Sequence, residues 1–156
     1  VPPNIPVTSI WGTNTKDVWL AGGSFLYRFT SGTLTLFKGY TWTKPLFTGD
    51  FSGIDGVSGH LFMVSRDASK SNGIVIKQSL TGSHVALNTG YKHAFHGVWA
   101  HSATSVWVVG KQGMYYYDGI KWSHVHTTTS AVNAVHGFGT NYFWAVGDGG
   151  KIYRCN

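Results

Sequence analysis

The chain has 156 residues, which is the size of one domain and enough for a substantial core. Its six acidic residues are all Asp, and the chain has no Glu and only two Met and two Gln, a scarcity of helix formers that argues against helices. Abundant Gly, Thr, Val and aromatic residues suit strands and tight turns. The net charge of +6 reflects few acids rather than clustered bases, so nothing predicts nucleic-acid binding, and no apolar run is long enough to span a membrane.

The first predicted repeat covers about residues 7–51 and contains the motif IWGTNTKDVWLAGG, which starts at Ile10. Gly-Gly and Ser-Gly pairs separate its apolar segments and supply the positive φ angles that tight hairpin turns need. Each segment has the length of a strand. The four segments lie around residues 10–11 and at residues 18–21, 25–29 and 34–37. This repeat therefore predicts a small antiparallel sheet.

The same motif recurs three times, once in a degenerate form. The later repeats cover about residues 52–95, 96–132 and 133–156, and their copies of the motif start at Ile54, Val98 and Val135. A period of about 40 residues built from short strands is the signature of a propeller blade. The sequence thus predicts an all-β fold, a small β-propeller of four repeats forming a single domain over residues 1–156.

A tryptophan marks the second strand of three repeats, at Trp19, Trp107 and Trp144, and Phe62 takes its place in the second repeat. A ring that recurs once per blade at one register could stack on a ligand or fill the gap between blades. The second interpretation is favoured, because a residue repeated in mid-strand is usually part of a core. We therefore expect all three tryptophans to be buried between sheets.

The last repeat stops after its third strand, which leaves a strand edge to be covered. An uncovered edge invites pairing with other chains. We expect residues 1–6 to run beside Lys151–Cys155, or another chain to cover that edge. The three prolines within residues 1–6 are acceptable in an edge strand.

The motif WGTNTKDVWLAGG from Trp11, together with YDGIKW from Tyr117, resembles the degenerate propeller repeats common in secreted bacterial proteins. The resemblance covers nearly the whole chain and implies a propeller in a secreted or cell-surface setting. That group includes adhesins, lectin-like domains and proteins of unknown role, so the resemblance implies no single activity. The sialidase Asp-box and the GH…WD pairing of WD40 blades are absent from the sequence.

No pattern in the chain predicts catalysis. The Asp residues are not paired for acid–base work, several stand at turns, and no nucleophile elbow is present. The eight His residues could contribute to a zinc site or to a titrating ring at the pore, but their spacing matches no known ligand motif. We therefore expect no enzyme, no cofactor, and no catalytic or metal site.

Aromatic residues in two connections between blades are the remaining functional signal. The connections at residues 39–51 and 88–96 carry a Gly-Tyr pair at the same register. Exposed Tyr and Trp rings suit sugar stacking or protein contact, and the alternative is that the rings tuck under their own loops. The predicted ligand-binding residues, expected on one face, are Tyr40, Trp42, Tyr91 and His93.

Together these features predict a non-catalytic extracellular recognition domain whose partner is a glycan or a cell-surface protein, with carbohydrate binding or adhesion as the favoured role. The alternative is a protein–protein interaction or assembly module completed by another chain, including a homo-oligomer. Flat aromatic platforms beside Asn, Asp or His would favour sugar, whereas a large apolar patch would favour protein. Nucleic-acid binding and membrane insertion are not expected.

Overall fold

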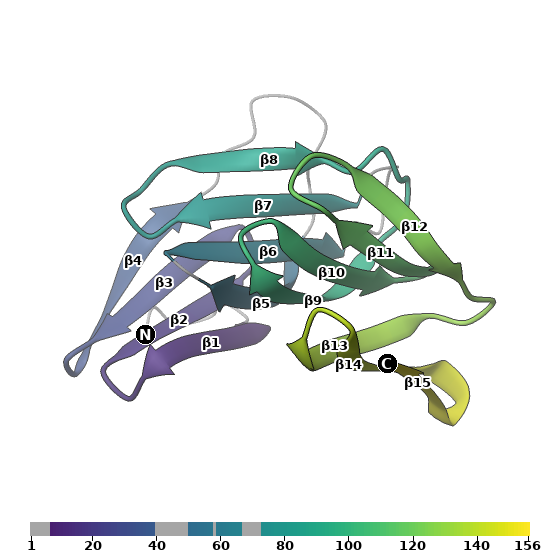
Figure 1. Ribbon diagram of the computed structural model, residues 1–156. Coiled ribbons are helices and arrows are strands. Elements are labelled where there is room, and N and C mark those ends of the chain that lie inside the picture. The colour runs from purple at the N-terminus through teal and green to yellow at the C-terminus, as the bar shows by residue number, and fades with distance from the viewer. Residues whose placement is uncertain (1–6, 40–49, 58, 67–72) are drawn as a thin grey trace.

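The computed structural model describes residues 7–39, 50–57, 59–66 and 73–156, which form four antiparallel sheets and no α-helix (Figure 1). Each sheet consists of strands that follow one another in sequence, and each corresponds to one predicted repeat. The prediction of an all-β fold with four repeats of three or four strands is confirmed. Within the described residues, no helix has the length and apolarity to cross a bilayer.

Within the described ranges, the four sheets contain fifteen strands. The first sheet is β1 (Ser9–Asn14), β2 (Asp17–Gly22), β3 (Phe25–Thr30) and β4 (Thr33–Gly39). The second is β5 (Asp50–Val57), β6 (His60–Arg66), β7 (Ile74–Ser79) and β8 (His84–Asn88). The third is β9 (Phe95–Ser102), β10 (Ser105–Gly110), β11 (Gly113–Tyr117) and β12 (Trp122–Thr127). The fourth is β13 (Val132–Gly139), β14 (Tyr142–Gly147) and β15 (Lys151–Cys155), with a 3-10 turn at Asp148–Gly150 before β15.

Glycine makes some of the hairpins possible. Gly113, at the turn from β10 to β11, has a φ of 133°, in the region that L side chains rarely adopt. A Cβ atom there would also collide with the carbonyl oxygen of His126 on the neighbouring strand β12. Gly113 therefore allows both the turn and the close approach of β12.

The sheets pack face to face in sequence order and enclose three apolar cores. The first strands of the sheets meet along the inner side, with β1 on β5, β5 on β9 and β9 on β13. Trp19 is fully buried between the first and second sheets, and Trp107, 8% exposed, is buried between the third and fourth. The predicted burial of these two rings is confirmed.

Polar side chains near the start of the first strands link successive sheets. These residues stand at the same register in the four repeats, two positions before the apolar residue that begins each motif. The links are Thr8 Oγ1 donating to the carbonyl oxygen of Phe51, Ser52 Oγ donating to that of Phe95 at 2.8 Å, and His96 Nδ1 lying 3.0 Å from Asn133 Oδ1. The inner rim is thus held by directional bonds as well as by apolar contact.

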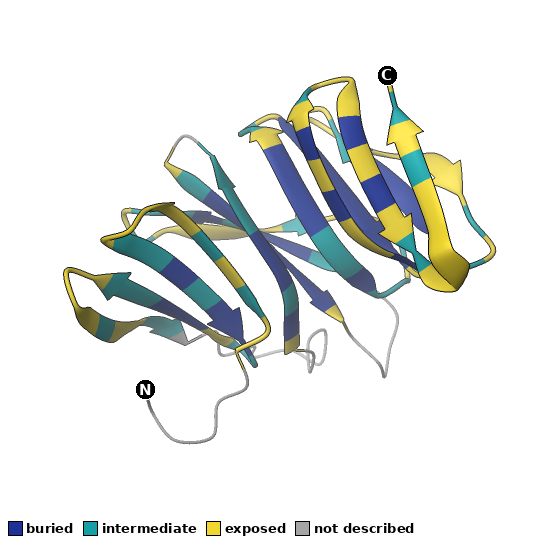
Figure 2. Cartoon of the chain, turned by 90° about the horizontal axis from the view of Figure 1, so that it is seen from below, coloured by how far each residue is buried: buried dark blue, intermediate teal, exposed yellow. Residues whose placement is uncertain are grey.

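The four sheets form an open arc rather than a closed ring. Figures 1 and 2 show the first and last sheets at opposite ends of the molecule, and among the described residues no packing like that of β9 on β13 joins β13 to β1. The expectation that Trp144 is buried is therefore wrong, because its side chain is 48% exposed. Trp144 occupies the same register as Trp19, but no following sheet covers it.

The outer edge of the fourth sheet is the edge of β15. Among the described residues, β15 pairs only with β14, and it is exposed over most of its length (Figure 2). The expected partner segment, residues 1–6, lies outside the described residues. The chain just after it is attached to the first sheet, where the N–H of Thr8 donates to the carbonyl oxygen of Ala21.

Candidate functional site

Each sheet has two faces, and the alternation of side chains along a strand assigns residues to them. In β6, Leu61 and Met63 belong to the core shared with the first sheet, whereas Phe62 and Val64 belong to the core shared with the third. We call the face toward the preceding sheet the leading face and the face toward the following sheet the trailing face. By this register, no sheet of the described residues packs on the leading face of the first sheet or on the trailing face of the fourth.

The leading face of the first sheet is apolar. Ile10 is 64% exposed and Leu36 is 55% exposed, whereas the equivalent of Ile10 in the second sheet, Ile54, is only 7% exposed. A shallow groove of about 560 Å³ runs over this face. Its lining residues are Ile10, Val18, Leu20, Phe29, Gly32, Thr33 and Leu34. None of these described lining residues is charged.

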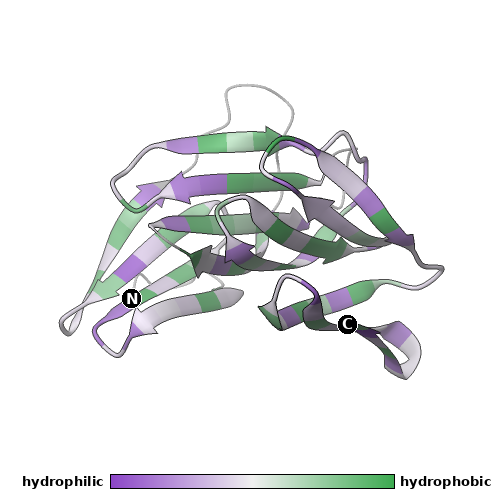
Figure 3. Ribbon diagram, in the orientation of Figure 1, coloured by the Kyte–Doolittle hydropathy of each residue, from purple (hydrophilic) through white to green (hydrophobic). Residues whose placement is uncertain are grey.

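The trailing face of the fourth sheet is also apolar, with a dense aromatic component. Bands of hydrophobic residues, green in Figure 3, reach both terminal sheets as well as the two inner ones. The exposed side chains of this face are Phe138 (86%), Tyr142 (64%), Trp144 (48%), Val146 (44%) and Ile152 (67%). Exposed apolar residues are common singly, but a contiguous group on one sheet face indicates an interaction surface.

In every sheet, an aromatic ring on the second strand is paired with a residue directly opposite it on the third strand. The trailing-face ring of the second strand lies opposite the trailing-face residue of the third strand. The pairs are Arg28 over Trp19 at 4.8 Å, Lys77 over Phe62 at 5.7 Å, Tyr116 beside Trp107 at 4.9 Å, and Arg154 over Trp144 at 5.5 Å. In the first three sheets the next sheet buries the ring. The fourth pair has the same design without a covering sheet.

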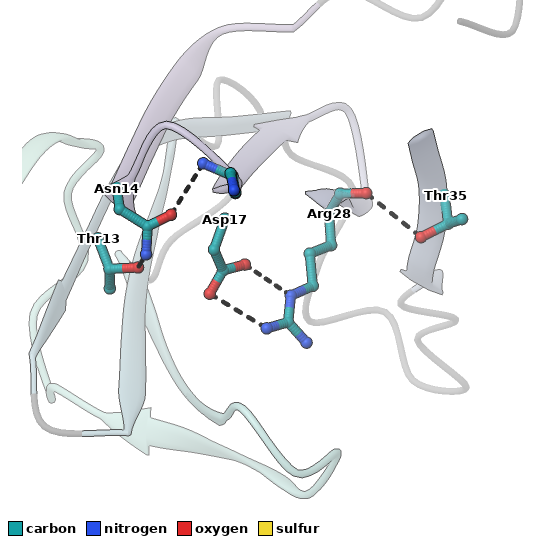
Figure 4. Close-up of polar contacts among 6 residues, drawn as sticks. Thr13, Asn14, Asp17, Arg28 and Thr35 are labelled. Atoms are coloured by element: carbon teal, nitrogen blue, oxygen red, sulfur yellow. Dashed lines mark hydrogen bonds and ion pairs between the residues drawn. The ribbon is translucent and has the colours of Figure 1, made fainter. Parts of the chain in front are cut away.

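The pair in the first sheet shows how the cation is held. Arg28 Nε donates to Asp17 Oδ1 at 2.7 Å, and Nη2 donates to Asp17 Oδ2 at 3.1 Å (Figure 4). The hydrogen bond to this carboxylate raises the pKa of Arg28, against the desolvation that lowers it. The guanidinium therefore stays charged and fixed above Trp19 at the interface with the second sheet.

A second groove lies beside the fourth sheet, where this sheet has no described fourth strand. Its volume is about 420 Å³. The lining residues are Trp107, Met114, Val125, His126, Phe143, Ile152, Tyr153, Arg154 and Cys155. The groove therefore adjoins the trailing face at Ile152 and Arg154, and it extends the apolar surface at this end of the arc.

The four predicted ligand-binding residues are described only in part. Tyr40 and Trp42 lie outside the described residues. Tyr91 is half-buried between the second and third sheets, with its ring centroid 4.6 Å from that of Tyr115, and burial together with Tyr91 raises the pKa of Tyr115 to about 12. His93 is half-buried in the same connection. No observation tests ligand binding at these four residues, and their role stays a prediction.

The acidic and histidine side chains that are described serve packing and turns. Asp55 Oδ2 accepts the N–H of Ala100 at 2.7 Å, which ties the second sheet to the third, and burial raises its pKa. Hydrogen bonds from the N–H groups of Lys121 and Ile120 lower the pKa of Asp118 at its turn. Among the described residues, no three His, Cys or Asp side chains are grouped to hold a metal ion.

The sequence reasoning missed the two terminal faces. Their signal is present in the chain, because β14 reads YFWAVG and alternates in the same way as β2, which reads DVWLAG. The alternation shows which residues share a face, but it does not show whether another sheet covers that face.

Comparison with known proteins gives matches in structure alone. The sequence matches no protein-family profile and no curated protein. The computationally designed protein Ika4 is 13% identical, with a TM-score of 0.70 over 97% of this chain and 91% of that one. YCF48 from Cyanidioschyzon merolae is also 13% identical, with a TM-score of 0.75 over 96% of this chain and 50% of that one.

The fold is that of a β-propeller. A further structure, YCF48 bound to D1 peptide, is 12% identical, with a TM-score of 0.63 over 100% of this chain and 66% of that one. The chain thus spans about half the length of the Cyanidioschyzon merolae protein and about two thirds of the peptide-bound one. At these identities the likeness concerns the propeller architecture.

Proposed function

We propose that this chain is a non-catalytic protein-interaction scaffold that binds protein through its terminal sheet faces. One observation carries the proposal: both faces of the inner sheets are buried, whereas the apolar leading face of the first sheet and the apolar trailing face of the fourth are exposed at the two ends of the arc. Uncovered apolar surface of this kind is typical of sites that bind other proteins. Among the features set out from the sequence, a large apolar patch is the one that favours protein over sugar.

The free energy available from burying the exposed apolar side chains of these faces supports protein binding. Fully burying one Val, Leu, Ile or Phe side chain contributes about 1.5–3 kcal/mol. Phe138, Ile152 and Ile10 are each more exposed than buried, and several other apolar residues on the same faces are half-exposed. Covering such a set is of the same order as the roughly 4–15 kcal/mol that association costs in lost freedom. The two faces are therefore large enough to matter energetically.

The comparison supports a protein partner as well. The similar structure of YCF48 has a peptide bound to it, the D1 peptide. A propeller of related architecture thus binds polypeptide in that protein. For this chain, protein binding is inferred from its own uncovered faces, and the fold is compatible with it.

Carbohydrate binding or adhesion in an extracellular setting is the finer role that the sequence favours. It rests on the loop residues, and of the two described ones Tyr91 packs its ring on Tyr115 rather than offering an open platform. Carbohydrate binding stays a prediction, to be tested by a glycan array with the purified chain. Saturable binding of one glycan class would support carbohydrate binding, and an array without any bound glycan would contradict it.

The protein-binding proposal is tested by site-specific photocrosslinking in the cell that produces the chain. A photoreactive residue replaces Ile10 or Trp144 on the two terminal faces, and Ile120, which is 90% exposed in a turn of the third sheet, provides the control position. We expect covalent adducts to protein, identified by mass spectrometry, from the two face positions and not from the control. Equal or absent adducts at all three positions would overturn the proposal.

A further inference from the structure

We propose that the partner on the terminal faces is a second copy of this chain. The trailing face of the fourth sheet in each copy lies on the leading face of the first sheet in the other, so that two arcs close into one ring of eight blades. This inference rests on the proposed function and names the occupant of the same surfaces. Eight blades fall within the four to eight that are typical of propellers.

The first argument is the equivalence of register between the uncovered faces and the three covered interfaces. The leading-face residues of β2 are Val18 and Leu20, and their counterparts in β6, Leu61 and Met63, are fully buried against the first sheet. On the other side, Trp144 stands where Trp19 and Trp107 stand. One chain therefore carries both halves of an interface that it already makes three times.

The second argument is a small residue that lies opposite a large one at the inner rim. At each covered interface, a trailing-face residue on the first strand of one sheet contacts a residue with little or no side chain on the first strand of the following sheet. The pairs are Trp11 with Gly56, Asp55 with Ala100, and Trp99 with Gly137. At the same register, the trailing face of the fourth sheet carries His136 and the leading face of the first sheet carries Gly12. His136 of one copy would therefore face Gly12 of the other.

The third argument is electrostatic. The described lining residues of the groove on the leading face are all uncharged, so an apolar partner surface suits them. The trailing face carries the cation of Arg154, which lies over Trp144 in the way that Arg28 lies over Trp19 at a covered interface. A stacked guanidinium is thus already accommodated between two sheets of this fold.

The two faces are different surfaces, so the contact is head-to-tail. Head-to-tail contacts form a closed ring if the rotation closes and an open filament if it does not. The first and last sheets already lie at the two ends of a curved arc (Figures 1 and 2). Closure by two copies covers both faces of each copy and leaves none to recruit a third.

The test is the mass of the purified 156-residue chain in solution, by light scattering and native mass spectrometry. We expect twice the 17.0 kDa of one chain. Three matched substitutions of exposed isoleucines follow: Ile10→Glu on the leading face, Ile152→Glu on the trailing face, and Ile120→Glu as the control (64%, 67% and 90% exposed). Because all three side chains are mainly exposed in the single chain, folding should survive, and circular dichroism checks it.

Either face substitution should weaken dimerisation at least about a hundredfold, because a charged carboxylate would replace an apolar side chain inside the contact and would lose its hydration, and the control should not. Mixing the Ile10→Glu and Ile152→Glu chains should restore a dimer, since one intact interface remains between them. If the Ile10→Glu chain, the Ile152→Glu chain or both remain dimeric alone, the head-to-tail contact is wrong. If a face variant is unfolded, Leu36→Glu or Phe138→Glu replaces it on the same face.

A monomeric wild-type chain at every concentration, or a ladder of larger oligomers, would overturn the two-copy ring. Either result is distinguishable from failure of the proposed function. If photocrosslinks from positions 10 and 144 join the chain to a different protein, protein binding stands and the second copy is excluded as the partner. If the chain is dimeric and the crosslinks join two copies through these positions, both proposals are supported.

Discussion

Replacing the same residue type at equivalent positions, Trp19 and Trp144, measures what a neighbouring sheet contributes. Trp19 is fully buried, so Trp19→Ala removes a complete side chain from the core and leaves a cavity. Such truncations cost about 3–5 kcal/mol. The indole N–H of Trp19 is buried without a hydrogen-bond partner in the described structure, and its removal relieves a penalty. We therefore expect Trp19→Ala to lower the free energy of unfolding by about 3 kcal/mol.

Trp144→Ala should cost much less in the single chain. About half of this side chain is already in contact with solvent. The buried half covers roughly 100 Å², which at about 25 cal/mol per Å² corresponds to an upper bound near 2.5 kcal/mol. Water fills the space that is left, so no cavity term is added. The expected loss is about 1–2 kcal/mol.

The assay is urea unfolding followed by circular dichroism, at a protein concentration low enough for the chain to be monomeric. Trp107→Ala, at the third interface, is the internal control and should behave like Trp19→Ala, since Trp107 is 8% exposed. Equal losses for Trp19→Ala and Trp144→Ala would refute the reasoning, because they would mean that Trp144 is as deeply packed as Trp19. Repeating the Trp144→Ala measurement at a high concentration adds the loss of the proposed dimer interface.

Three further predictions concern contacts inside the arc. Burial raises the pKa of Asp55 above its unfolded value, so the contribution of Asp55 to stability is greatest in acid and is lost as the pH rises through the folded pKa. Asp55→Asn should therefore flatten the pH dependence of the unfolding free energy, measured by urea unfolding between about pH 4 and pH 7. Gly56→Ala places a Cβ 2.7 Å from the ring of Trp11, so we expect the free energy of unfolding to fall by about 1–3 kcal/mol, measured by thermal unfolding. An unchanged Tm would show that β1 and β5 can separate freely. Tyr91→Ala should destabilise the fold by about 2–4 kcal/mol, because the ring packs on Tyr115, so glycan-binding tests with this variant need a parallel unfolding curve; full stability would mean that the ring is free for a ligand.

Much of the local structure follows from residue order alone. The short apolar run Val106, Trp107, Val108 and Val109, followed by a glycine-rich turn, is enough to predict one strand of an antiparallel sheet, and β10 (Ser105–Gly110) is found there. The period of the motif likewise predicted four sheets in sequence order. These features depend on interactions between residues close in sequence, and short-range patterns encode such interactions directly.

The candidate site was less accessible to sequence reasoning. Loop aromatics such as Trp42 stand out in a sequence because they break the repeat, and their predicted role in binding is not yet tested. Trp144 follows the repeat, and for that reason it was expected to be a core residue. A residue that obeys the pattern is exposed only when its neighbouring sheet is absent, which the pattern does not record.

By itself, the sequence determined the all-β class, the strand order and the face of the sheet on which each side chain lies. The tertiary structure alone decided that the arc stays open, and with it the exposure of Trp144 and Ile10. Closure depends on the small rotation between successive sheets, summed over all of them. That rotation is set by packing between residues distant in sequence, such as Trp99 against Gly137, and no local motif specifies it.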